Sequence, residues 1–219
     1  MEKKVIEQKE MNYMFFDTET GGLNPKIHSL LTAYFAVCNR DLNIIDELEL
    51  QLKPADLTKL NLTQAAMDIN KINIEEHLKD PSTITYEEGR VKLKQFFINN
   101  KIKGKRQSLM PCGHNISFDK DMIWEQLMPK EEFEEYVHYR TLDTSNVTSF
   151  LKDVGIFPED LGNLMSLVEH FGVPKQEAHN AKGDVRMNVE VYKRMRAMME
   201  NRKKDMVGGN NSLLEIIEI

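Results

Sequence analysis

Two carboxylates early in the sequence have a type and spacing that suit a metal-binding site. Asp17 and Glu19 follow the apolar run 13–16, which is typical of a β-strand. Alternate side chains of a strand point to one face, so both carboxylates would project together, just before a turn at Gly21 and Gly22. Like charges beside a buried strand are costly unless a cation or hydrogen bonds compensate them. On this stretch alone, a cation site and an ordinary solvent-exposed strand end are equally good interpretations.

Two more acids and one histidine lie next to other core-facing positions. Asp119 opens an expected helix, where an acidic side chain can simply satisfy free backbone amides. Met122 and Ile123 follow it by three and four residues, however, so Asp119 faces the apolar side of that helix. Asp184 begins the last expected helix, and His179 precedes it by five residues in the entering loop.

Together these residues predict one shared cation site. The four acids come from three separate segments of the chain. Ligand sets made only of oxygen favour hard ions such as Mg²⁺ or Mn²⁺ over zinc. His179 then remains available as a general base, because the pKa of an unperturbed imidazole lies near neutrality. Taken alone, His179 and Asp184 would be ordinary surface residues, and only the whole set favours a site.

The order of the apolar patterns predicts one α/β domain with a mixed β-sheet flanked by α-helices. Three β-prone segments come first and favour an antiparallel meander, and helices then alternate with further strands. Thr85 and Glu88 fit a capping box, and an apolar helical face runs from Leu161 to a C-cap at Gly172. The expected strands are residues 12–18, 30–38, 44–52 and 139–143, together with a short strand that runs into a turn within 108–115.

The composition is that of an ordinary globular protein. The 219 residues are 41% hydrophobic and 29% charged, which allows one substantial core. A net charge of −6 excludes a protein that holds nucleic acid through phosphate contacts alone. The two cysteines fit a reducing compartment, and residues 1–10 lack the apolar stretch of a signal peptide. We therefore expect a cytoplasmic, or at least intracellular, location without membrane contact; the sequence leaves a viral or phage origin open.

The expected boundaries are an N-terminal extension at 1–11, a domain at 12–206, and a flexible linker with a short amphipathic tail at 207–219. The tail could dock on a protein partner, fray, or pack on its own domain. Four basic residues lie between 101 and 106, and a solvated loop is favoured there over a patch that faces phosphate.

Three segments resemble the motifs of the DEDDh exonucleases, in the proofreading-exonuclease (DnaQ-like) superfamily. Residues 16–23 resemble the first motif, and residues 113–119 resemble the second. His179, followed by four residues and then Asp184, resembles the third. A sister branch of the superfamily has a tyrosine where Asn180 stands, which disfavours that branch. Each motif alone is weak, but three in this order are specific.

This resemblance implies a ribonuclease H-like fold and release of nucleoside 5′-monophosphates from the 3′ end of nucleic acid. It implies two divalent cations, Mg²⁺ or Mn²⁺, about 4 Å apart, with His179 as the general base. The implied metal ligands are Asp17, Glu19, Asp119 and Asp184. The implied contacts to the terminal nucleotide are the backbone of Thr20 and Gly21, the side chain of Leu23 and, more weakly, Asn115 and Phe118. Asn115 could instead only close its turn, and Leu23 and Phe118 could be core residues.

The sequence does not decide the identity of the substrate. We expect a nucleic acid with a free, single-stranded 3′ end, and DNA rather than RNA. DNA proofreading or repair, with a polymerase or repair factor docked on the tail at 208–219, competes with RNA trimming or the degradation of small RNAs. A non-catalytic nucleic-acid-binding or polymerase-accessory subunit is the alternative from another class of protein.

Overall fold

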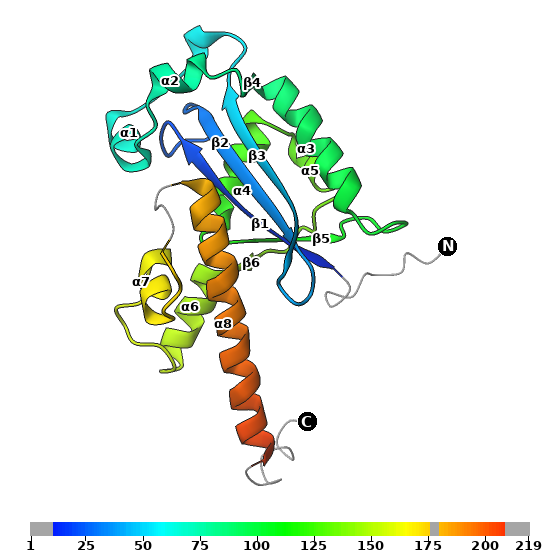
Figure 1. Cartoon of the computed structure of the whole chain (residues 1–219), viewed down its shortest axis with the longest axis vertical. Helices are drawn as coiled ribbons and strands as arrows, with labels where there is room; N and C mark the ends of the chain where they lie inside the picture. The colour runs from blue at the N-terminus through cyan, green and yellow to red at the C-terminus, as the bar shows by residue number, and fades with distance from the viewer. Residues whose placement is uncertain (1–10, 176–179, 209–219) are drawn as a thin grey trace.

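The computed structural model describes residues 11–175 and 180–208 of the chain. Its centre is a six-stranded sheet with the order β4-β3-β2-β1-β5-β6 (Figure 1). β1, β2 and β3 pair antiparallel, whereas β4, β5 and β6 run parallel to β3, β1 and β5 respectively. The predicted α/β class, meander and mixed sheet are confirmed. The strands are β1 (Asn12–Thr20), β2 (Leu30–Cys38), β3 (Ile44–Lys53), β4 (Thr83–Thr85), β5 (Leu109–Gly113) and β6 (Leu142–Asp143).

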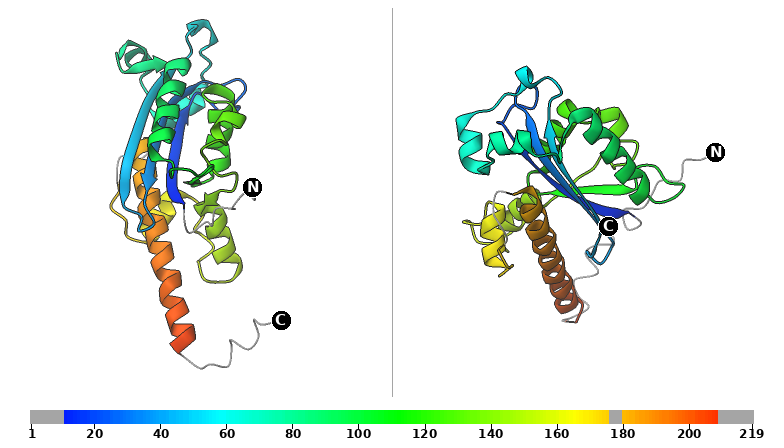
Figure 2. Two further views of the ribbon diagram at one scale, coloured as in Figure 1. Left: turned by 90° about the vertical axis from the view of Figure 1, so that its right-hand side faces the viewer. Right: turned by 45° about the horizontal axis from the view of Figure 1, so that its top comes forward.

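Helices cover both faces of the sheet (Figures 1 and 2). α3 and α4 pack on one face against β3 and β1, and α8 crosses the other face against β1 and β2. α6 and α7 lie beside α8, whose C-terminal half extends beyond the sheet (Figure 2). None of the helices in the described part of the chain combines the length and apolarity that a bilayer span requires. The helices are η2 (Leu57–Lys59), α1 (Gln64–Asn70), α2 (Ile74–Lys79), α3 (Tyr86–Asn100), α4 (Ile116–Gln126), α5 (Lys130–Phe133), α6 (Thr144–Asp153), α7 (Leu164–His170) and α8 (Ala181–Gly208).

The alternation of β1 decides which face its acids reach. Phe16 is buried in the core under α3 and α4, and Phe15 is buried in the core under α8. Each buried phenylalanine contributes about 2 kcal/mol to stability, so the register of the strand is strongly fixed. Asp17 and Glu19 lie on the same face as Phe15, and therefore on the side of α8.

Two predicted elements differ from the structure. The expected strand 139–143 shrinks to β6, because the backbone N–H of Arg140 donates to His138 Nδ1 in a turn and Tyr139 points into solvent. The expected helical face from Leu161 begins only at α7, because Asn163 caps that helix. Leu161 itself is buried ahead of the helix, in the core shared by α6, α7 and α8. The predicted capping box of Thr85 and Glu88 is present.

The expected boundaries also shift where the structure describes them. Met11 is buried in the core under α8, so it belongs to the domain rather than to an extension. α8 continues through Gly208, so residues 207 and 208 are helical rather than part of a linker. The remainder of the expected extension and tail, residues 1–10 and 209–219, lies outside the described residues.

Candidate active site

Three of the four predicted acids meet at the end of β1. One carboxylate oxygen from each of Asp17, Glu19 and Asp184 lies within 4.8 Å of the other two. β1 supplies the first pair, and the first turn of α8 supplies Asp184. That turn is fixed by Asn180, whose Oδ1 accepts from the N–H of Lys182 and whose carbonyl accepts from the N–H of Asp184, both at 3.0 Å. Residues far apart in the sequence thus share one site.

Asp119 approaches the same place from α4, on the other face of β1. Only 5% of its surface is exposed. Its Oδ1 accepts from the backbone N–H of Thr18 at 2.9 Å and from Thr18 Oγ1 at 2.7 Å. Thr18 is the residue between Asp17 and Glu19, so these bonds fix Asp119 beside the group of three acids.

The crowded acids raise one another's pKa. Burial raises the pKa of Asp17 well above its usual value, and the charges of Asp119, Glu19 and Asp184 add to that shift. Burial and the charges of Asp184 and Asp119 raise the pKa of Glu19 to about 8. Burial raises the pKa of Asp119 to about 7, against the lowering effect of its bonds to Thr18. A divalent cation would relieve this repulsion, and the oxygen-only donor set suits Mg²⁺ or Mn²⁺.

The predicted base, His179, lies outside the described residues. The structure begins again at Asn180, which caps α8. The role of His179 therefore stays a prediction.

In the turn after β1, backbone carbonyls are hydrogen-bonded within the protein. The carbonyl of Thr20 accepts from Asn70 Nδ2 at 3.0 Å, and the carbonyl of Gly21 accepts from the N–H of Thr63 at 2.7 Å. A Cβ on Gly21 would lie 2.4 Å from the carbonyl oxygen of Asn61. Close packing against the segment before α1 is thus enough to require glycine here, without any contact to a nucleotide.

The other predicted substrate contacts differ in exposure. Leu23 is 84% exposed at the tip of the turn, so the alternative of a core residue is wrong. Asn115 is exposed and caps α4 with a left-handed backbone (φ 63°), but its side chain makes no capping bond. Phe118 is half-buried and packs against the core under α4. Contact of any of these residues with a nucleotide stays a prediction.

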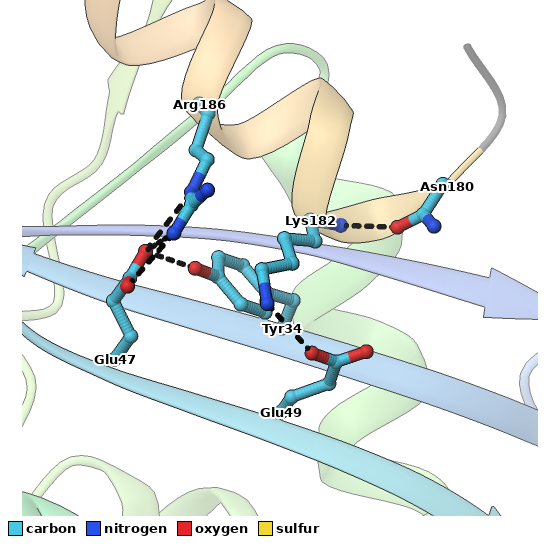
Figure 3. A network of polar contacts seen from close by, with 6 residues as sticks. All are labelled: Tyr34, Glu47, Glu49, Asn180, Lys182 and Arg186. Atoms are coloured by element: carbon cyan, nitrogen blue, oxygen red, sulfur yellow. Dashed lines mark hydrogen bonds and ion pairs between the residues drawn. The ribbon is translucent and has the colours of Figure 1, made fainter. Parts of the chain in front are cut away.

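A polar network that the sequence analysis missed joins α8 to the strands (Figure 3). Arg186 binds Glu47 with nitrogen–oxygen distances of 3.0–3.1 Å, and the hydroxyl of Tyr34 donates to the same carboxylate. Lys182 Nζ lies 3.2 Å from Glu49. The sequence carries a pattern that fits this network. Lys182 and Arg186 are four residues apart on one helix face, and Glu47 and Glu49 point to one face of a strand.

A cavity of about 300 Å³ lies beside the acids and this network. Glu19 and Lys182 line it together with side chains of β2, β3 and the α1–α2 segment. The basic loop at 101–106 lies elsewhere. Asn12, at the start of β1, pairs with Leu109 just after the loop, whereas the acids lie at the other end of β1. This placement favours the solvated-loop interpretation.

Comparison with known proteins identifies the relatives of this chain. Residues 14–192 match the family model RNase_T, described as Exonuclease. An oligoribonuclease of Vibrio parahaemolyticus is 26% identical over 187 residues, covering 84% of this chain and 93% of the relative. An oligoribonuclease of Photobacterium profundum is 27% identical over 141 residues, covering 63% and 74% respectively.

Solved structures of exonuclease I share the fold. E. coli exonuclease I in complex with a dT13 oligonucleotide superposes with a TM-score of 0.67 at 20% identity, and the enzyme of Methylocaldum szegediense with 0.64 at 21%. Each match covers 84% of this chain and 40% of the other, so this chain spans about two-fifths of those proteins. The ribonuclease H-like fold is thereby confirmed. With a family match over most of its length, the chain belongs to the RNase_T exonuclease family of DEDDh, DnaQ-like 3′–5′ exonucleases.

Proposed function

We propose that the chain hydrolyses single-stranded nucleic acid from its 3′ end and releases nucleoside 5′-monophosphates. The observation that carries the proposal is the meeting of Asp17, Glu19 and Asp184, with Asp119 fixed beside them through Thr18. Family membership supports the reaction class, and the arrangement of these acids supports the place where it occurs.

The acids and His179 have different tasks in this proposal. When bound, two divalent cations, Mg²⁺ or Mn²⁺, would neutralise phosphate charge and lower the pKa of a water at the scissile bond. Asp17, Glu19 and Asp184 would hold the cations, and Asp119 would add an oxygen from the opposite face of β1. His179 would accept the proton of the attacking water. The water oxygen bonds to phosphorus and the bond from phosphorus to the 3′-oxygen breaks. The shortened chain keeps that oxygen, which takes a proton from solvent and becomes a hydroxyl, and the phosphate leaves with the released nucleotide.

The turn after β1 would receive the terminal nucleotide. Leu23 is exposed enough to pack against a base, and Asn115 and Phe118 border the start of the helix that carries Asp119. Thr20 and Gly21 would act through the shape of the turn, because both of their carbonyls are bonded within the protein.

The preference for DNA over RNA stays a prediction. The exonuclease I structure with dT13 is a complex with DNA, but its 20% identity supports only the shared fold. The relatives named oligoribonuclease favour short RNA as the second candidate substrate. Docking of a polymerase or repair factor on the tail and an intracellular location also stay predictions.

The test compares labelled single-stranded DNA and RNA, each of 3 and about 20 nucleotides, with Mg²⁺, Mn²⁺ or EDTA. We expect wild type to shorten these substrates from the 3′ end only with metal. Asp17→Asn should lose this activity, because it removes a metal-holding charge while keeping the shape of the side chain. The control is Asp41→Asn, which neutralises an exposed acid in the turn between β2 and β3. Full activity of Asp17→Asn would refute the site, and binding without cleavage by wild type would support the non-catalytic alternative.

A further inference from the structure

A buried carboxylate outside the four predicted acids joins the starts of two helices. Asp143 ends β6 and is only 6% exposed. Its Oδ1 accepts from the N–H groups of Asn115 and Ser145, both at 2.9 Å, and its Oδ2 accepts from the N–H of Ile116 at 3.1 Å. One carboxylate therefore caps both α4 and α6.

α4 depends on this cap more than an ordinary helix would. Its own N-cap residue, Asn115, has a left-handed backbone and makes no side-chain capping bond. The first amides of a helix need an acceptor, and a charged acceptor makes bonds roughly twice as strong as a neutral one. Asp143 supplies that acceptor from a strand 27 residues further along the chain.

The capped turn leads directly to the site. Asp119 lies three residues after Ile116, one turn into α4, and its Oδ1 meets both donors of Thr18. The bonds of Asp143 at the start of α4 and the bonds of Thr18 at Asp119 therefore hold the same turn from two sides. A shift of the helix start would displace the Asp119 carboxylate relative to Asp17 and Glu19.

The residue after Asp143, Thr144, connects this region to α8. Thr144 Oγ1 lies 3.0 Å from the carbonyl oxygen of Gly113 and 3.0 Å from Asn188 Oδ1. Asn188 is buried on α8, one turn after Asp184. Asp143 and Thr144 thus lie at the point where the two acid-bearing helices are joined.

We propose that Asp143 is a positioning residue, which sets the start of α4 so that Asp119 reaches the cation site; this rests on the proposed function. Asp143 would touch neither substrate nor cation, and its hydrogen bonds would act on Asp119 through Ile116 and α4. Burial raises the pKa of Asp119, and the charge of Asp143 also raises it. Removing a group that orients a metal ligand typically lowers metal affinity or activity about 10–100-fold.

The test uses the full chain and compares Asp143→Ala and Asp143→Asn with Asn163→Ala. Asn163 caps α7, which carries no predicted site residue. Asn163→Ala is therefore the control that removes a helix cap away from the site. Mn²⁺ affinity is measured by calorimetry, and kcat and KM are measured on labelled oligonucleotides, at a temperature where circular dichroism shows each variant folded. We expect Asp143→Asn to weaken Mn²⁺ binding and lower kcat at saturating Mn²⁺ by about 10-fold or more, with little change in KM. Asn163→Ala should lower only the melting temperature.

Asp143→Asn is the decisive variant if Asp143→Ala fails to fold, because the amide keeps one acceptor oxygen. Wild-type Mn²⁺ affinity and kcat in Asp143→Asn would overturn the proposal while leaving the proposed function intact. A wild-type chain that neither binds Mn²⁺ nor cleaves would overturn the proposed function and this proposal together. Equal losses in Asp143→Asn and Asn163→Ala would reduce Asp143 to a purely structural cap and so overturn the proposal.

Discussion

α4 and α8 each bring one carboxylate to the same site, but different interactions hold the N-terminal parts of the two helices. On α4, the bond from the N–H of Ile116 to Asp143 and both bonds from Thr18 to Asp119 are buried. On α8, the ion pair of Arg186 with Glu47 is about one-third exposed, with exposed side-chain fractions of 36% and 33%. Buried bonds to a charged group contribute more to stability than exposed ion pairs, which salt and water weaken.

The two acid-bearing helices are therefore held by different kinds of contact. Asp119 is fixed by hydrogen bonds that leave it little freedom to move. The helix that carries Asp184 packs on the sheet through Val185 and Val189, which are buried. We therefore expect substitutions around α4 to change the rate of catalysis. Substitutions around α8 should change the repulsion among the acids of the site and, weakly, the stability of the fold.

The largest expected effect concerns the charge of the site without metal. The pKa of Glu19 is raised from 4.5 to about 8 in the folded protein, so its contribution to stability is present below pH 4.5 and is lost as pH rises to about 8. The loss is several kcal/mol, because one pKa unit corresponds to about 1.36 kcal/mol. The melting temperature in EDTA should fall from pH 7 to pH 8, and Mg²⁺ or Mn²⁺ should reverse the fall. Asp184→Asn should melt higher than wild type at pH 8 in EDTA.

Between pH 7 and pH 8 the repulsion among the acids can be measured with little interference from the histidines. The pKa values of His114 and His138 are lowered by burial, so folding favours their neutral forms and stability rises until pH passes 6.5, their usual pKa. Above pH 7 only a small part of this opposing contribution remains. A melting temperature that stays level from pH 7 to pH 8, with or without metal, would show that the acids do not repel one another as the structure indicates.

A smaller effect is expected from Thr18→Val, which tests the rigid placement of Asp119. The variant removes the hydroxyl that donates to Asp119 Oδ1 and keeps the backbone donor. We expect a loss of about 1–2 kcal/mol in the free energy of unfolding and about 10-fold in kcat. Urea unfolding and turnover of a labelled oligonucleotide measure the two effects. Thr148→Val is the matched control, because it removes a buried hydroxyl bonded to the carbonyl of Thr144 on α6. Equal turnover in both variants would contradict a fixed Asp119.

Local patterns in the sequence predicted the parts of the fold that depend on near neighbours. The alternation of Asp17 and Glu19 after an apolar run and the capping box of Thr85 and Glu88 need only a few consecutive residues. β4 escaped prediction because three residues carry too little pattern, and it forms only where Gln51 to Lys53 of β3 pair with it.

Contacts between distant segments could not be predicted in the same way. Asp143 caps α6 within its own segment, but its second role, as a cap of α4, depends on where β6 lies beside β5. The pairing of Arg186 with Glu47 joins residues 139 positions apart, and it exists only because α8 crosses the sheet. In the site itself, residue types and order indicated the acids, whereas tertiary structure decided which of them meet.

The smallest expected effect comes from the ion pair that holds α8. A double-mutant cycle with Arg186→Met and Glu47→Gln should give a coupling energy of about 0.5 kcal/mol, because both side chains are partly exposed. The amide introduced by Glu47→Gln keeps an acceptor for the hydroxyl of Tyr34, so the cycle isolates the charge pair. Urea unfolding measures the coupling, and the pair of Lys79 with Glu75 on α2 is the control for a largely exposed ion pair. Turnover should stay at the wild-type level in every variant of the cycle. A coupling above about 2 kcal/mol, or a loss of turnover like that of Thr18→Val, would mean that α8 is held as rigidly as α4, and the contrast between the two helices would disappear.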